Sequence, residues 1–132
     1  MAKKFKFNVK IYYEDTDSGG VVYYANYLKF LERARSETLY SLDFTNSGLL
    51  ENYGILLIVK SCNIEYKKPA KFEDELEIIS EVLTFTKTSF IMKQDIMRKD
   101  EIISVAEIHL VAVDKNGKPK KIPEELKQKL QN

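Results

Sequence analysis

Residues 14–39 read EDTDSGGVVYYANYLKFLERARSETL and join two different kinds of sequence. The first part, residues 15–20, is Asp-Thr-Asp-Ser-Gly-Gly, a concentration of turn-forming residues. From Tyr24 onward the apolar residues recur at helical spacing, on a stripe of Tyr24, Tyr27, Leu28, Leu31 and Ala34. The stretch therefore predicts a tight loop that leads directly into a long helix with a wide apolar face.

Outside this stretch the chain predicts mainly strands. Near the N-terminus, apolar residues alternate with polar ones at Phe5, Phe7, Val9 and Ile11. Four later segments are rich in β-branched and aromatic residues, at 55–66, 75–86, 89–98 and 102–113. Their short connections, such as the polar turn at 98–101, favour antiparallel pairing.

Smaller features complete this prediction. We expect Ser47-Gly48 to end the long helix, a short helical turn to follow it, and a terminal helix to begin at Pro123. The apolar parity slips between Ile78 and Ile79, which indicates a β-bulge. A single apolar helix beside such strands is most stable on the concave face of their sheet. The predicted fold is α+β, a five-stranded antiparallel sheet wrapped around one long central helix (the hotdog architecture), with residues 1–132 as a single domain.

The composition restricts the compartment and the partners. Lysine and arginine number 21 and aspartate and glutamate 20, so the net charge of +1 gives no electrostatic footprint for nucleic acid. The longest apolar run, residues 55–59, is far too short to span a bilayer. A single cysteine fits a reducing compartment. We expect a cytoplasmic protein that binds no nucleic acid and has no membrane span.

The same composition restricts the chemistry. The chain has one histidine, His109, and one cysteine, Cys62, and no cluster of residues at metal-ligand spacing. Both read better as structural residues, His109 within a strand and Cys62 as a buried filler. We therefore predict no metal site and no cofactor. Carboxylates and backbone dipoles are the groups left for catalysis.

Residues 14–39 resemble the signature of the 4-hydroxybenzoyl-CoA thioesterase family, and are most similar to the YbgC-type acyl-CoA thioesterases of bacteria. The matching positions are Asp17, Gly20, Val21, Val22, Tyr23, Asn26 and Tyr27. The resemblance continues through IEYKKPAKFEDEL at residues 64–76 and DKNGKPKKIP at 114–123. Many YbgC-type sequences carry histidine where this chain has Tyr24, so no role of that histidine carries over.

The resemblance implies a hydrolase that converts acyl-CoA thioesters to a carboxylic acid and CoA. It selects Asp17 as nucleophile or general base, although the residues alone leave Asp17 and Asp15 equally suited to a turn or a helix cap. It places the donor that polarises the thioester carbonyl at the backbone N–H of Tyr24, where the helix dipole adds positive charge. Further contacts to substrate are expected from Gly20, Val22, Tyr23, Lys87 and Ser89, with Lys87 at a CoA phosphate.

The resemblance also implies partners and leaves rivals open. Family members bind their ligand between subunits, which implies a homodimer or homotetramer, and a sheet with free edges agrees with that. An acyl carrier protein is an alternative carrier of the acyl group. The rival functions are a non-catalytic acyl-CoA binding or interaction module and a hotdog hydratase. The hydratase is disfavoured because such sites pair a carboxylate with a histidine, and the glycine loop has none.

Overall fold

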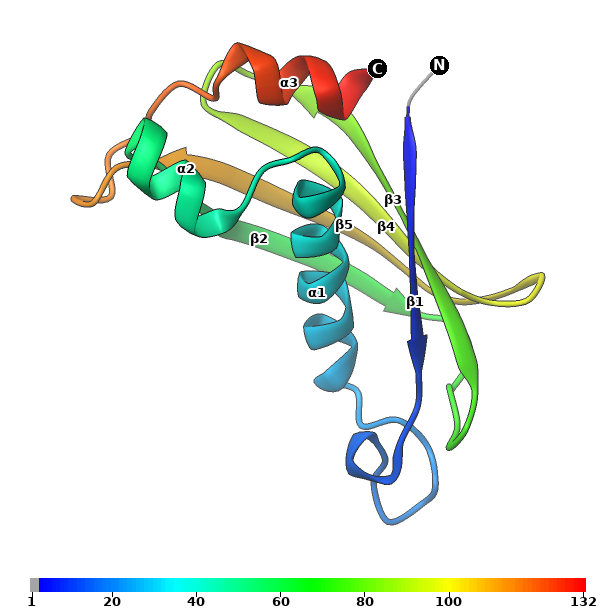
Figure 1. Cartoon of the computed structure of the whole chain (residues 1–132). Helices are drawn as coiled ribbons and strands as arrows, with labels where there is room; N and C mark the ends of the chain where they lie inside the picture. The colour runs from blue at the N-terminus through cyan, green and yellow to red at the C-terminus, as the bar shows by residue number, and fades with distance from the viewer. Residues whose placement is uncertain (1–2) are drawn as a thin grey trace.

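The computed structural model describes residues 3–132 and shows one antiparallel sheet with a long helix against it (Figure 1). The five strands lie in the order β1-β3-β4-β5-β2. Their bounds are Lys4–Lys10, Leu56–Tyr66, Glu75–Phe85, Ser89–Arg98 and Glu101–Val113 for β1 to β5. The helices are α1 (Asn26–Ser41), α2 (Asn46–Tyr53) and α3 (Glu124–Gln131), with a short 3₁₀ turn, η1, at Tyr13–Asp15. The predicted α+β hotdog architecture is confirmed.

The two edge strands have different surroundings. β1 pairs with β3, and its apolar side chains Phe5, Phe7 and Val9 pack against the core. β2 forms the other edge, and within residues 3–132 it pairs with β5 alone. Most residues of β2 are exposed, among them the apolar Leu56, Ile58 and Val59. An edge with free backbone groups and exposed apolar side chains is a surface that proteins normally cover.

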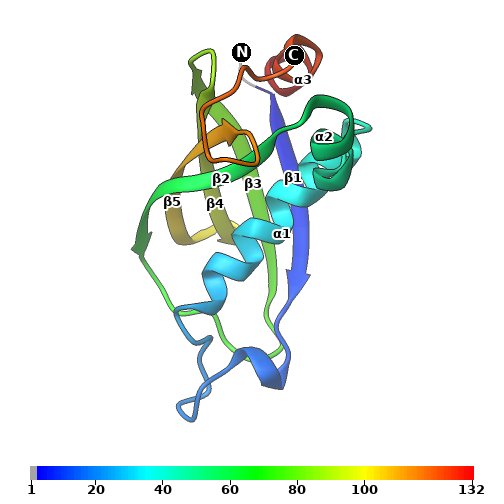
Figure 2. The ribbon, with the colours of Figure 1, turned by 90° about the vertical axis from the view of Figure 1, so that its left-hand side faces the viewer.

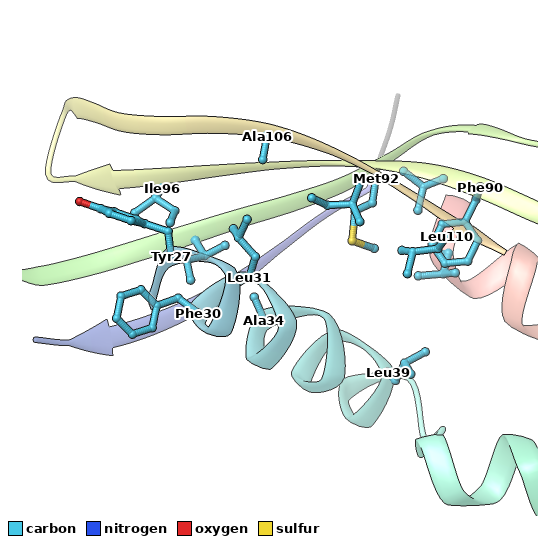
Figure 3. Close-up of a cluster of buried hydrophobic side chains, with 14 of the residues drawn as sticks. Tyr27, Phe30, Leu31, Ala34, Leu39, Phe90, Met92, Ile96, Ala106 and Leu110 are labelled. Carbon is cyan, nitrogen blue, oxygen red and sulfur yellow. The ribbon is translucent and has the colours of Figure 1, made fainter. Parts of the chain in front are cut away.

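The helix α1 crosses the concave face of the sheet (Figure 2). Its apolar stripe meets side chains of β4 and β5 (Figure 3), and the labelled contacts include Phe30 and Leu31 of the helix, Met92 and Ile96 of β4, and Leu110 of β5. Both Phe30 and Leu31 are almost completely buried. Burial of one such side chain contributes roughly 1.5–3 kcal/mol, so packing rather than local propensity holds the helix in place.

A buried polar side chain ties α1 to the sheet. Gln94 of β4 has no exposed surface, and its Nε2 donates to the carbonyl oxygen of Leu31 and to Oγ of Ser80, both at 3.0 Å. Its Oε1 accepts a hydrogen bond from Nη1 of Arg35, also at 3.0 Å. Because burial of an unpaired amide is costly, these bonds define the depth and the rotation of the helix on the sheet.

Three local predictions were wrong. The regular part of α1 begins at Asn26 rather than Tyr24, because the residues before it form tight turns. Ser47-Gly48 does not lie between helices: Thr45 caps α2 by accepting from the Gly48 N–H at 2.8 Å, so both residues are inside the helix. The bulge of β3 lies between Val82 and Thr84 instead of at Ile78-Ile79.

In the part of the chain that the structure describes, no helix is long and apolar enough to cross a membrane.

Candidate functional site

The loop between β1 and α1 holds Asp17 in a small hairpin. Thr16 and Val22 form an antiparallel bridge, and the Asp17 N–H donates to the carbonyl oxygen of Val21 at 2.9 Å. Gly20 closes the turn by donating to the Asp17 carbonyl oxygen at 3.1 Å, with a positive φ of 81° that favours glycine. The turn chemistry predicted for residues 15–20 is therefore present.

The Asp17 carboxylate is exposed and only half engaged. Its Oδ1 accepts the N–H of Gly19 at 2.8 Å, which is the contact of an Asx-turn. Within residues 3–132, its Oδ2 takes part in no hydrogen bond or ion pair. One carboxylate oxygen thus shapes the loop while the other remains available to a substrate or a water molecule.

Asp15 has the opposite character. Its Oδ2 accepts the Tyr12 N–H at 2.9 Å, and its carbonyl oxygen accepts both the Tyr23 N–H and Nδ2 of Asn26. These bonds join the 3₁₀ turn to the start of α1. Asp15 is a structural member of the loop, so the two aspartates that the composition could not separate differ clearly in their surroundings.

The start of α1 presents two unpaired donors. The N–H groups of Asn26, Tyr27 and Leu28 each bond three residues back, at 2.9, 3.3 and 3.3 Å. In the described chain, the N–H groups of Tyr24 and Ala25 donate to no protein acceptor. Such orphan donors, with the positive end of the helix dipole behind them, can stabilise a developing negative charge.

Three tyrosine rings lie close together at the start of α1. Tyr24 lies 4.9 Å from Tyr23 and 6.4 Å from Tyr66 between ring centroids. The Tyr66 hydroxyl, at the end of β2, donates to the Tyr24 carbonyl oxygen at 3.2 Å. Partial burial raises the pKa of Tyr66, so this phenol stays protonated as a donor at neutral pH. The sequence prediction missed Tyr66, although its place at the end of the 55–66 strand pattern, directly before the matching proline segment, was a usable signal.

The segment of residues 67–74, here called the supporting segment, holds the loop from outside. The Val22 N–H donates to the Ala70 carbonyl oxygen at 2.8 Å, and the Ala70 N–H donates to the Tyr27 hydroxyl at 3.1 Å. The rings of Tyr13 and Phe72 stack with centroids 3.9 Å apart. The loop that carries Asp17 is thus packed against a segment about fifty residues further along the chain.

The structure brings together only some of the predicted site residues. Asp17, Gly20, Tyr23 and Tyr24 share the exposed loop and helix start, whereas Val22 is buried, so its side chain serves the core. Lys87 and Ser89 lie at the β3–β4 turn beside α3, at the opposite end of the sheet from the loop (Figure 1). Ser89 is buried and shares a hydrogen bond of 2.6 Å with Thr86. Within one chain, neither residue reaches Asp17.

The histidine and the cysteine form no dyad. In the β2–β5 pairing, Cys62 faces Ile108 and Ser61 faces His109. Neighbouring residues of a strand point to opposite faces, so Cys62 and His109 lie on different sides of the sheet. Partial desolvation raises the pKa of the Cys62 thiol, which disfavours the reactive thiolate. Cys62 is nevertheless exposed, so its description as a buried filler was wrong. No group of three His, Cys, Asp or Glu residues within 3–132 is arranged to hold a metal ion.

A cavity of about 240 Å³ lies beside the second half of α1, between the helix and strands β2, β4 and β5. Its walls are mainly apolar, and the apolar lining residues are Leu39, Leu57, Val59, Phe90, Met92, Leu110 and Leu130. The polar side chains of Glu32, Ser36, Thr38 and Asn46 complete the lining. Arg35 reaches it from the helix, and burial lowers the pKa of its guanidinium. An apolar group therefore has room in this cavity beside α1.

Comparison with known proteins agrees with the fold and indicates the family. An acyl-CoA thioesterase named YbgC from Haemophilus influenzae is 42% identical over 124 residues, covering 93% of this chain and 91% of that protein. The Escherichia coli O6:H1 YbgC, an acyl-CoA thioester hydrolase, is 37% identical and covers 92% of each chain. A probable thioesterase from Bartonella henselae superposes with a TM-score of 0.88, at 31% identity over 92% of this chain and all of that one.

A mutant 4-hydroxybenzoyl-CoA thioesterase in complex with 4-hydroxybenzoyl-CoA has the same fold, with a TM-score of 0.92 at 18% identity over 98% of this chain and 100% of that one. Sheet, helix and loop together define a hotdog protein of the thioesterase type. The chain belongs to the Thioesterase-like superfamily, whose pattern matches residues 12–130. The predicted resemblance is confirmed.

Proposed function

We propose that this protein hydrolyses acyl-CoA thioesters at the loop between β1 and α1, with Asp17 as the catalytic carboxylate. The enzyme class is the one named for the relatives that match over 92–93% of the chain, and the predicted thioester hydrolase is confirmed at that level. The role of Asp17 rests on one observation: its unengaged Oδ2 lies in the same exposed loop as the two unpaired N–H groups of Tyr24 and Ala25.

Asp17 has two chemical routes. In one, Oδ2 attacks the thioester carbonyl carbon, the C–S bond breaks to release CoA thiolate, and water hydrolyses the resulting mixed anhydride. In the other, Asp17 takes a proton from a water molecule, which attacks the same carbon. Both routes consume one water and yield the carboxylic acid and CoA thiol. Both create a negative oxygen that needs donors.

The helix start supplies those donors. The Tyr24 N–H is the donor indicated by the family resemblance, and the adjacent Ala25 N–H is equally unpaired in the described chain. One oxyanion donor contributes roughly 2.7–4 kcal/mol to transition-state stabilisation. The Tyr24 side chain is not the donor in this proposal, so tyrosine in place of histidine at this position leaves the polarising group unchanged.

We further propose a homodimer formed along β2. Its free edge carries exposed Leu56, Ile58 and Val59, and antiparallel pairing with a second copy would cover it. Such pairing inverts the second copy along the strand direction. The β3–β4 turn of the partner then faces the Asp17 end of the first chain, which is how the partner subunit's Lys87 would reach a CoA phosphate. A tetramer would require a second interface.

The acyl group would occupy the cavity beside α1, because it is mainly apolar and adjoins the same helix. Acyl-CoA or an acyl carrier protein would deliver it, in the cytoplasm.

A hydratase is disfavoured because His109 lies on β5, away from the loop of Asp17. A binding module without turnover makes a different prediction for purified protein: it would retain acyl-CoA without releasing thiol.

Release of free thiol from a series of acyl-CoA esters tests the proposal directly. We expect turnover by the native chain and its loss in Asp17→Asn, with binding of a non-hydrolysable acyl-CoA analogue retained. Analogue binding without any thiol release by the native chain would instead support the binding module. The acyl length at which turnover declines would measure the usable depth of the cavity.

A further inference from the structure

The supporting segment is itself held from its outer side by one residue. Arg98, at the end of β4, donates from Nη1 to the Asp74 carboxylate at 2.6 Å and to the Pro69 carbonyl oxygen at 3.2 Å. These two acceptors lie near opposite ends of the supporting segment. One guanidinium therefore spans the segment that carries the Asp17 loop.

Arg98 is in turn anchored at the β4–β5 turn. Its Nε donates to Oε1 of Glu101 at 3.1 Å, and its Nη2 forms an ion pair with the same oxygen. Lys68, within the supporting segment, pairs with Oε2 of Glu101 at 2.6 Å. The hydrogen bonds to Glu101 and to Asp74 raise the pKa of Arg98 further, so it is charged at every physiological pH. The planar Arg98 guanidinium is therefore held by several directed, charge-assisted hydrogen bonds.

Asp74 transmits this anchoring to the loop. The oxygen Oδ2 that receives Arg98 also accepts the Lys71 N–H at 2.8 Å, and Lys71 forms an antiparallel bridge with Val21. The Asp74 carbonyl oxygen accepts the N–H of Ile11 at 2.9 Å, directly before the loop. Contacts therefore run without a break from Arg98 through Asp74 to Val21 in the hairpin that contains Asp17, and to Ile11 at the start of the loop.

We infer that Arg98 is a positioning residue for the hydrolytic site, which fixes the supporting segment and through it the placement of Asp17 and of the helix-start donors. This inference rests on the proposed function of that loop. Arg98 touches no reacting atom. Its effect is on geometry, to which catalysis is sensitive because a misplacement of about 1 Å can lower a rate about a hundredfold.

A role in global stability makes a different prediction. Ion pairs at partly exposed positions contribute little to the free energy of unfolding, and the Arg98 side chain is about a quarter exposed, at 24%. Removal of the guanidinium should therefore loosen the loop without lowering the overall stability in proportion. Lys93 provides a matched control on the same strand, since its one ion pair in the described chain is with Asp95, at 3.1 Å.

The first test needs no enzymatic activity. Amide hydrogen exchange would be followed in full-length Arg98→Met, Arg98→Lys and Lys93→Met. We expect the Val22 and Ile11 amides, which donate to the supporting segment, to exchange at least about tenfold faster in Arg98→Met. The Lys120 amide, which donates to Ala112 in a different part of the sheet, should be unchanged. Uniform acceleration of all amides, or none at Val22, would overturn the inference.

The second test uses kinetics. Arg98→Met should lower kcat by at least about tenfold with KM changed less than about twofold, because the groove remains while the geometry is lost. Arg98→Lys keeps the charge but loses the planar set of guanidinium donors, so its kcat should lie between those of Arg98→Met and the native chain. Asp74→Asn combined with Arg98→Met should lower kcat no more than either change alone. Equal effects of Arg98→Met and Lys93→Met would contradict the inference.

Failure of this inference and failure of the proposed function give different results. If Asp17→Asn is inactive while Arg98→Met exchanges and turns over like the native chain, the function stands and the positioning role falls. If Asp17→Asn is fully active, the proposed role of Asp17 falls, and with it the positioning role in catalysis. Local acceleration of exchange at Val22 would then show only that Arg98 orders the loop.

Discussion

The Tyr66 hydroxyl donates to the Tyr24 carbonyl oxygen at 3.2 Å, which links the end of an edge strand to the first turn of α1. The same carbonyl oxygen accepts the Tyr27 N–H at 3.3 Å. Two donors on one oxygen restrict rotation of the Tyr24–Ala25 peptide, whose own N–H is one of the two unpaired groups. Tyr66 of β2 thus fixes the orientation of the Ala25 N–H at the start of α1.

Tyr66→Phe would remove this hydroxyl and keep the ring that packs on Tyr24 and Tyr27. We expect kcat to fall by about two- to tenfold, the range that corresponds to one net hydrogen bond of roughly 0.5–1.5 kcal/mol. KM should change little, because the aromatic surface remains. Steady-state thiol release measures both. A large rise in KM with constant kcat would show that Tyr66 binds substrate instead.

Asp17→Asn and Asp15→Asn form a matched pair two residues apart. We expect Asp17→Asn to lower kcat by at least about a hundredfold, since loss of a general base typically has this effect or more. Asp15→Asn retains an acceptor for the Tyr12 N–H and should keep most of the activity. Equal losses in both variants would indicate collapse of the loop, and full activity of Asp17→Asn would exclude the proposed chemistry.

Ala25→Pro removes one unpaired N–H without an evident clash at its own φ. The backbone angles of Ala25 are φ −67° and ψ −22°, and proline prefers a φ near −65°. If the Ala25 N–H stabilises the oxyanion, kcat should fall by about 10²–10³. Ala25→Ser retains the N–H and serves as the control, and urea unfolding of both variants checks the fold. An active Ala25→Pro would leave the Tyr24 N–H as the sole donor.

Ile58→Asp places a carboxylate on the free edge of the sheet, where Ile58 is 46% exposed and lies outside the lining of the cavity. Two such charges at a shared edge would repel, so we expect light scattering to show monomers and thiol release to fall sharply. Leu83→Asp alters an equally exposed residue, at 45%, on β3. It should keep the native assembly and the native activity. An Ile58→Asp monomer with full activity would contradict a site shared between subunits.

Glu101 predicts a specific pH dependence of stability. Lys68 and Arg98 lower the pKa of its carboxyl from 4.5 to about 2. A carboxyl with a lowered pKa stabilises the fold above its ordinary pKa, and that contribution disappears as the pH falls from 4.5 toward 2. The urea midpoint of Glu101→Gln should therefore fall slightly less steeply over this range than that of the native chain, and the difference should be small because solvent screens these exposed ion pairs. Glu37→Gln, at an exposed position on α1, should follow the native curve.

Much of the fold could be predicted because hydrophobic periodicity encodes it locally. The alternation at Phe5, Phe7 and Val9 and the stripe that contains Tyr27 and Leu31 translated directly into strand and helix. The errors occurred where a single local contact or register shift determines the position of an element. Thr45 turns Ser47-Gly48 from a predicted break into the first turn of α2. The bulge of β3 lies between Val82 and Thr84, further along the strand than the predicted Ile78-Ile79.

The site was less predictable because it depends on contacts between distant segments. Sequence similarity indicated Asp17 and Tyr24, but the different surroundings of Asp15 and Asp17 follow only from the folded loop. Tyr66 and Arg98 act over more than forty and more than seventy residues of chain, respectively, and no local pattern reports that proximity. Lys87 shows the reverse: it matched a family position, yet its chain places it at the far end of the sheet.

The buried amide of Gln94 has a consequence for the entropy of the reaction. Because Gln94 bonds to Leu31 and Arg35, α1 cannot slide or rotate without leaving an amide unpaired in the core. The N–H groups at the start of that helix are therefore oriented before any ligand arrives. Their conformational freedom is lost once, when the chain folds, and does not have to be lost again in each catalytic cycle.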